Sequence, residues 1–188
     1  MAGHADSQGI ERAGTSGEAV SINGLSPMDT SMADELFWNI KVRDAIVKRG
    51  KLSGLNINSY DPIVRTILEE NDPRTNWSVG AQHARKGGYV LEIHFDSYGR
   101  DGHGSGLIPA LTNDLNQIDE SLAKAFGRYP LFFRGGLGAP KRGIRILEIG
   151  KLEGALESSL RESSKSDLTI DLIARKVIQA IQIGMNKI

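Results

Sequence analysis

Gly88-Gly-Tyr-Val-Leu-Glu-Ile-His-Phe-Asp96 is the stretch that decides the fold. It reads as a buried strand, because a strand covered on both faces shows a nearly continuous apolar run. Ligands of open α/β sheets collect at the carboxyl ends of such strands, and His94 falls at that end. A lone histidine there is either a metal ligand or a neutral core residue that donates to a backbone carbonyl. Further histidines or carboxylates at the ends of neighbouring elements would favour the metal ligand over the neutral core residue.

A second apolar strand is expected at residues 144–150, and it carries a carboxylate, Glu148, inside it. A carboxylate within a buried strand is expected to have an ion-pair partner or a catalytic role, because burying an unpaired charge is unfavourable. Glu148 is therefore either a catalytic acid/base or half of a salt bridge with an arginine such as Arg145.

Helical periodicity of apolar residues is expected at 34–47, 72–85, 116–126 and 167–186, and a short strand at 54–60. Ser31 is a candidate N-cap for the first helix. The segment 5–31 is rich in Gly, Ser, Thr and Ala and is expected to form a long loop. Strands that alternate with helices predict one α/β domain over residues 1–188, with a mostly parallel twisted sheet and helices on both faces.

Composition narrows the function classes. The 188 residues are 39% apolar and 24% charged, with 23 charges of each sign, as in an ordinary globular domain. The balanced charge, without a basic stripe, argues against a nucleic-acid-binding protein. The chain has no cysteine, so a transition metal must be held by histidine and carboxylate. The sequence as given shows neither an export signal nor an apolar run of about 18 residues, so no membrane insertion is expected.

Four features follow one another along the chain: Gly3-His4, Glu35 at the start of the first long helix, Ile93-His94, and Glu148. This order resembles the zinc-dependent N-acetylmuramoyl-L-alanine amidases of the family 3 type, which cleave the bond between glycan and stem peptide in peptidoglycan. Three smaller similarities accompany it: Asn56-Ile-Asn-Ser-Tyr-Asp61 at the family's second strand, Ser121-Leu-Ala123 in the helix where the family has Ser-x-x-Leu-Ala, and Arg142-Gly-Ile144 before the last strand.

The resemblance implies that His4, Glu35 and His94 bind Zn²⁺ and that Glu148 does the acid/base work. Two imidazoles and a carboxylate leave a fourth position on zinc open for water. Glu18 is an alternative to Glu35, since its spacing from His4 is closer to that of the family, although it lies in the glycine-rich segment rather than at a helix start.

This chain also departs from the family pattern. Gly3-His4-Ala5-Asp6 replaces Gly-His-Gly-Gly, Glu92 replaces the serine of Ser-Ile-His, and Asp96 replaces an asparagine. Only Met1 and Ala2 precede the Gly-His, where the family has a first strand.

The predicted function is thus zinc-dependent hydrolysis of the amide between N-acetylmuramic acid and L-alanine, with the muramoyl stem peptide of peptidoglycan as partner. Action at the cell wall or periplasm is implied, reached by a phage-type lysin route or by a delivery machine. Two alternatives stay open. One is a catalytically silent module of the same fold that binds wall fragments or builds a larger assembly. The other is a zinc hydrolase acting on another amide.

Other polar residues receive weaker assignments. His103, in a Gly-His-Gly turn, is either a substrate-side group or solvated, and His83 is expected to be a cation near a helix end. Asp96 or Asp6 could orient a ligand imidazole. Three cations of the glycine-rich 134–143 segment could contact stem-peptide carboxylates or simply be solvated: Arg134, Lys141 and Arg142.

Overall fold

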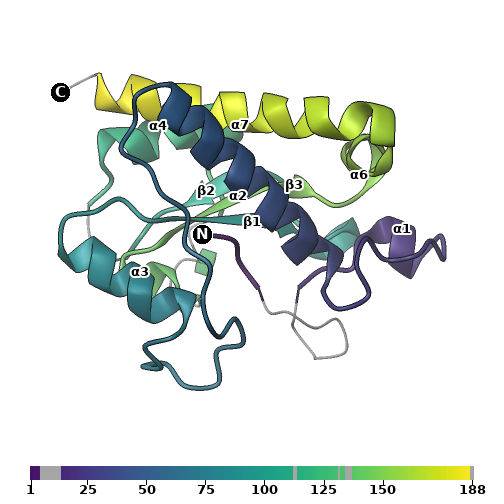
Figure 1. The fold of residues 1–188 in the computed structure, drawn as a ribbon, viewed down its shortest axis with the longest axis horizontal. Helices are drawn as coiled ribbons and strands as arrows, with labels where there is room; N and C mark the ends of the chain where they lie inside the picture. Colours follow the sequence, from purple (N-terminus) through teal and green to yellow (C-terminus); the bar gives the residue numbers. More distant parts are fainter. Residues whose placement is uncertain (5–13, 112–113, 131, 134–136, 187–188) are drawn as a thin grey trace.

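The computed structural model describes residues 1–4, 14–111, 114–130, 132–133 and 137–186 of the chain (Figure 1). Its centre is a three-stranded sheet in the order β1-β3-β2. The strands are β1 (Leu91–Asp96), β2 (Gly106–Ile108) and β3 (Arg145–Lys151). The two apolar stretches that the sequence pattern marks as buried strands are therefore neighbours in space.

The sheet is mixed, so the prediction of a mostly parallel sheet was wrong. β1 runs parallel to β3, whereas β2 runs antiparallel to it. The reason lies in the connection after β1, which holds only a short 3-10 turn, η1 (Gly99–Asp101). A parallel return needs a crossover of a dozen or more residues, usually a helix. Without one, the chain turns back and β2 enters the sheet in the opposite direction.

The first residues of the chain lie along the free edge of β1. Ala2 forms a parallel bridge with Ile93. The Ile93 amide donates to the Met1 carbonyl at 2.9 Å, and the Gly3 amide donates to the Ile93 carbonyl at 3.0 Å. This pairing ends at Gly3, so His4 stands beside the strand that carries His94.

Helices flank the sheet unequally (Figure 1). Three helices cover one face, namely α2 (Asp34–Leu52), α4 (Gln117–Phe126) and α7 (Ser163–Met185), whereas α3 (Asn76–Arg85) lies toward the other. The main core forms under the three helices. It takes alternate strand residues, Ile93 and Phe95 from β1 and Leu147 and Ile149 from β3. The intervening side chains point to the opposite face, because strand side chains alternate with period two.

Several predicted elements differ in the structure. Residues 54–60, all of them described, form no strand, because the chain turns back on the end of α2: the Leu55 amide donates to the Gly50 carbonyl at 3.0 Å. The expected 5–31 loop contains a short helix, α1 (Glu18–Ser21), and α6 (Gly154–Arg161) precedes α7.

Helix α2 begins after Ala33, so Ser31 is not its N-cap; the Ser31 hydroxyl bonds Asp29 instead. In the part of the chain that the structure describes, every helix is too short or too polar to cross a bilayer.

Candidate metal centre and its neighbouring carboxylates

Glu35 lies at the centre of the candidate site. It occupies the first turn of α2, where the helix dipole favours a carboxylate. Its side chain is 2% exposed. The Thr15 amide donates to Oε2 at 2.9 Å, and the Phe95 amide donates to Oε1 at 3.2 Å. Two backbone donors from distant segments thus hold this carboxylate in one orientation.

Two imidazoles converge on the Oε1 atom of Glu35. His4 Nε2 lies 2.9 Å from it and His94 Nδ1 lies 3.3 Å from it. The two rings meet edge to face, with centroids 4.7 Å apart. One ligand atom from each of His4, Glu35 and His94 lies within 4.8 Å of the other two, and the described residues contain no second such group. The structure brings together the three residues that the sequence marks as zinc ligands.

Steric contact with the His94 ring explains why position 3, before His4, is a glycine. A Cβ atom on Gly3 would lie 2.1 Å from Cε1 of the His94 ring, so only glycine lets that ring lie against the backbone here. His4 itself has a φ of 70°, in the left-handed region that non-glycine residues rarely adopt. Such conformations persist where the surroundings enforce them, often at functional sites.

The charges of these groups are strongly coupled. Burial opposes ionisation of Glu35, but the charge of His4 and hydrogen bonds to both imidazoles hold the pKa of Glu35 well below its usual range. Burial would lower the pKa of His94, yet the neighbouring carboxylates of Glu35 and Glu92 raise it well above its usual value. The site therefore favours positive charge at the point where the three side chains meet.

The donor set suits a zinc ion. Two imidazoles and one carboxylate are a common catalytic zinc ligand set, and a cation bound between them would take the place of protons on the imidazoles. Glu18 is not in this group: it lies in α1, where its amide donates to the Leu152 carbonyl at 3.0 Å. Geometry therefore favours Glu35 over Glu18 as the carboxylate ligand.

Glu148 stands beside His94 on the same face of the sheet, since the two residues pair across β1 and β3. It is 9% exposed, and its Oε2 atom has no hydrogen-bond partner among the described residues. Burial raises the pKa of Glu148 to about 8, a shift that His94 opposes and that the carboxylates of Glu35, Asp96 and Glu92 reinforce. A carboxyl group with these properties can hold a proton at neutral pH.

The suggested salt bridge between Glu148 and Arg145 does not form. Arg145 lies on the other face of β3, where its Nε donates to Asp119 Oδ1 at 3.0 Å and its guanidinium stacks on Tyr89, 4.7 Å from the ring centroid. Residues three apart on a strand point to opposite faces. Alternation alone therefore separates these two side chains.

Glu92 is a site residue that the sequence reading did not single out as functional. It shares the sheet face of His94 and is 4% exposed, with Oε2 3.5 Å from His94 Nε2. Asp96, considered as a group that orients a ligand imidazole, instead accepts hydrogen bonds from the amides of His103 and Gly104, at 2.5 and 2.7 Å. Asp6 lies outside the described residues. The period-two spacing of positions 92 and 94 is the signal that could have identified Glu92.

His103 belongs to a cluster of aromatic rings rather than to the metal-type group. Its ring lies 5.4 Å from Tyr129 and 4.9 Å from Phe133, and Phe133 in turn lies 4.4 Å from Phe132, which is 73% exposed. Burial and the neighbouring Asp96 carboxylate raise the pKa of Tyr129 above its usual value. The cluster thus leads from the sheet face of Glu148 to the surface.

The remaining sequence candidates lie apart from the site. Arg142 pairs with Glu70 at 3.0 Å and stacks on Trp77, and the exposed Lys141 precedes it in η2 (Pro140–Arg142); Arg134 lies outside the described residues. His83 is in the last turn of α3.

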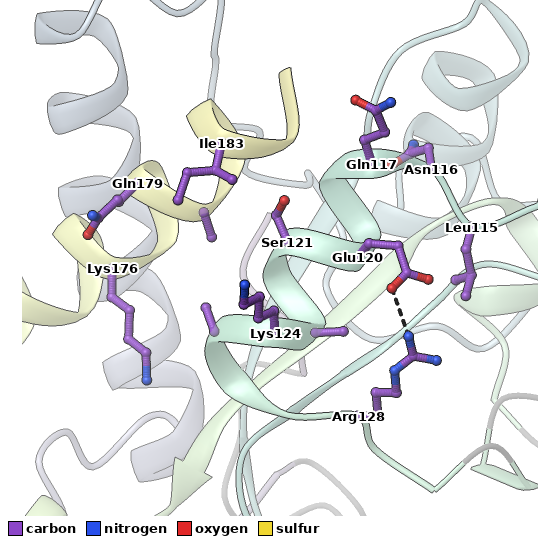
Figure 2. A pocket seen from close by; sticks show the side chains of 13 residues that line it. Leu115, Asn116, Gln117, Glu120, Ser121, Lys124, Arg128, Lys176, Gln179 and Ile183 are labelled. Atoms are coloured by element: carbon purple, nitrogen blue, oxygen red, sulfur yellow. Dashed lines mark hydrogen bonds and ion pairs between the residues drawn. The ribbon is translucent and has the colours of Figure 1, made fainter. Parts of the chain in front are cut away.

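A groove of about 900 Å³ lies between α4 and α7, where Glu120 pairs with Arg128 beside Lys124 (Figure 2). None of its lining residues belongs to the His–Glu group, so we do not assign the chemistry to it.

Comparison with known proteins bears on the fold. No family model and no curated protein matches this sequence. Among solved structures, the catalytic domain of CwlV, an N-acetylmuramoyl-L-alanine amidase from Bacillus (Paenibacillus) polymyxa var. colistinus, matches with a TM-score of 0.56 at 15% identity. The match covers 99% of this chain and 94% of that one.

The catalytic domain of the CD27L endolysin targeting Clostridia difficile matches with a TM-score of 0.50 at 15% identity, over 79% of this chain and 83% of that one. This chain therefore shares the fold of the CwlV catalytic domain, as the sequence resemblance predicts.

Proposed function

We propose that this protein is a zinc-dependent N-acetylmuramoyl-L-alanine amidase. The observation that carries the proposal is the convergence of His4, Glu35 and His94 beside Glu148, a buried carboxyl without a hydrogen-bond partner among the described residues. The fold shared with an amidase catalytic domain supports the same reaction class. That match covers nearly the whole of both chains, which supports residues 1–188 acting as one catalytic domain.

His4, Glu35 and His94 would hold the metal. A bound zinc ion supplies Lewis acidity, which polarises a carbonyl and lowers the pKa of water. The protein contributes a fixed carboxylate, through the Thr15 and Phe95 amides that hold Glu35. It also contributes close packing, because Gly3 lets the two imidazoles approach each other.

Glu148 would move the proton. It takes a proton from the attacking water, whose oxygen bonds to the lactyl carbonyl carbon, and delivers that proton to the L-alanine nitrogen as the C–N bond breaks. The pKa of Glu148 is about 8. A group whose pKa lies near the working pH can both accept and donate a proton, so this value suits the role near neutral pH. Burial raises the pKa of the carboxyl to this range, because it disfavours the charged form.

We place the action of the protein at the cell wall, with the muramoyl stem peptide as substrate. CwlV is named as an amidase with that substrate bond, and CD27L as an endolysin. A phage-type lysin or a machine-delivered enzyme fits such an activity.

The deciding experiment is digestion of purified peptidoglycan with and without a chelator, with mass spectrometry of the products and elemental analysis of the protein. The proposal expects about one zinc per chain and chelator-sensitive release of stem peptides with a free L-alanine amine. Glu148→Gln should abolish release while zinc stays bound. Binding of wall fragments without cleavage would instead identify a catalytically silent module, and cleavage of a different amide would reassign the substrate.

A further inference from the structure

Glu92 is a buried carboxylate beside the second imidazole of the site. Its Oε2 atom lies 3.5 Å from His94 Nε2, and its Oε1 atom accepts a hydrogen bond from Asn76 Nδ2 at 3.1 Å. His94 Nε2 has no hydrogen-bond partner among the described residues, and Glu92 Oε2 is the carboxylate oxygen that faces it. The carboxylate therefore faces two nitrogens, one on each oxygen.

Asn76 ties this carboxylate to the segment that carries His4. It is the first residue of α3, and the Nδ2 atom that contacts Glu92 also donates to the Ala2 carbonyl at 2.8 Å. Ala2 is two residues before His4 and pairs with Ile93. One buried amide group thus connects both histidine-bearing segments.

A carboxylate at position 92 calls for an explanation. Burying a carboxylate among apolar residues is unfavourable unless it is hydrogen-bonded and paired, and its register partner on β3 is the apolar Ile146. The family pattern that this chain resembles has a serine here. Besides Asn76 Nδ2 and the charge of the Met1 ammonium group, Glu92 faces the His94 nitrogen that points away from Glu35.

We propose that Glu92 is a positioning residue for His94, which keeps the proton on Nε2 and leaves the Nδ1 lone pair free for a cation. The inference rests on the proposed function of His4, Glu35 and His94 as zinc ligands. Metal-binding histidines generally donate their other ring N–H to an acceptor, which fixes the tautomer and ring orientation. Here that acceptor is the Glu92 carboxylate, held in turn by Asn76.

Glu92→Gln tests this role at nearly constant volume. A glutamine offers one acceptor oxygen, whereas His94 Nε2–H and Asn76 Nδ2 both need one. In either orientation, the NH₂ group of the new amide therefore faces one of these two donors, which loses its acceptor. Loss of such an outer partner typically weakens metal affinity about 10–100-fold, and we expect a loss in that range.

The measurement is the zinc dissociation constant, obtained by competition with a chromophoric chelator. Glu148→Gln is the matched control, because it removes a carboxylate from the same sheet face without removing an acceptor from an imidazole. The loss in Glu92→Gln should exceed that of the control at least about tenfold. Equal affinities in the two variants would overturn the inference. A wild-type protein that binds no zinc would instead refute the proposed function.

A second measurement needs no variant. Nitrogen-15 NMR of the zinc-loaded wild-type protein reports which ring nitrogen of His94 carries the proton. We expect the proton on Nε2, slowly exchanging with solvent, and zinc on Nδ1. A proton on Nδ1 would overturn the inference even if Glu92→Gln failed to fold.

Discussion

Glu148 should make the metal-free protein less stable as the pH rises, and Glu148→Gln should remove this dependence. The folded-state pKa of Glu148 is raised from 4.5 to about 8, mainly by burial. Below pH 4.5 the carboxyl is protonated in both the folded and the unfolded state. Between the two pKa values the unfolded chain releases the proton first, so the free energy of unfolding falls as pH rises.

The size of the effect follows from the shift. Each pH unit between the two pKa values changes the free energy of unfolding by about 1.4 kcal/mol. Between about pH 5.5 and 7.5, wild type should therefore lose about 3 kcal/mol relative to Glu148→Gln. Titrating groups that do not interact with Glu148 contribute equally to both proteins and cancel in the difference.

Urea denaturation in the presence of a chelator, followed by tryptophan fluorescence at several pH values, measures this difference. Glu69→Gln, at an exposed carboxylate, is the control and should track wild type at every pH. The reasoning is refuted if the stability difference between Glu148→Gln and wild type stays constant across this pH range. A constant difference would mean that Glu148 ionises as readily in the folded protein as in the unfolded chain.

Three further predictions concern the site. His94→Ala should abolish zinc binding by elemental analysis, whereas Glu18→Ala should retain it; zinc loss in the second variant would make Glu18 the ligand. Gly3→Ala should weaken zinc affinity at least about tenfold by chelator competition, because the added Cβ would meet the His94 ring at 2.1 Å and displace it. Phe132→Ala should raise KM for peptidoglycan about threefold to tenfold with kcat nearly unchanged, as loss of one stacking contact of about 1 kcal/mol predicts. Leu168→Ala, at an exposed apolar residue of α7, is the control for that change and should leave KM as it is.

The amino-acid sequence by itself determined the two buried strands, the three long helices and the residue types of the site. Apolar runs marked β1 and β3 as buried strands, and the polar residues inside them, His94 and Glu148, stood out because they break that pattern. Helical periodicity marked α2, α4 and α7. The resemblance carried by Gly3-His4, Glu35, His94 and Glu148 agrees with the fold that the structure shows.

Only the tertiary structure decided how these parts meet. The antiparallel direction of β2, the chain reversal at 54–60 and the pairing of Arg145 with Asp119 each depend on partners distant in sequence. The link from Glu92 through Asn76 to Ala2 joins three segments that no local pattern relates. Periodicity in the sequence predicts which side of an element is buried, but it does not predict which distant residues form hydrogen bonds or ion pairs. The role of Glu92 therefore became visible only in the tertiary structure, where it lies beside His94.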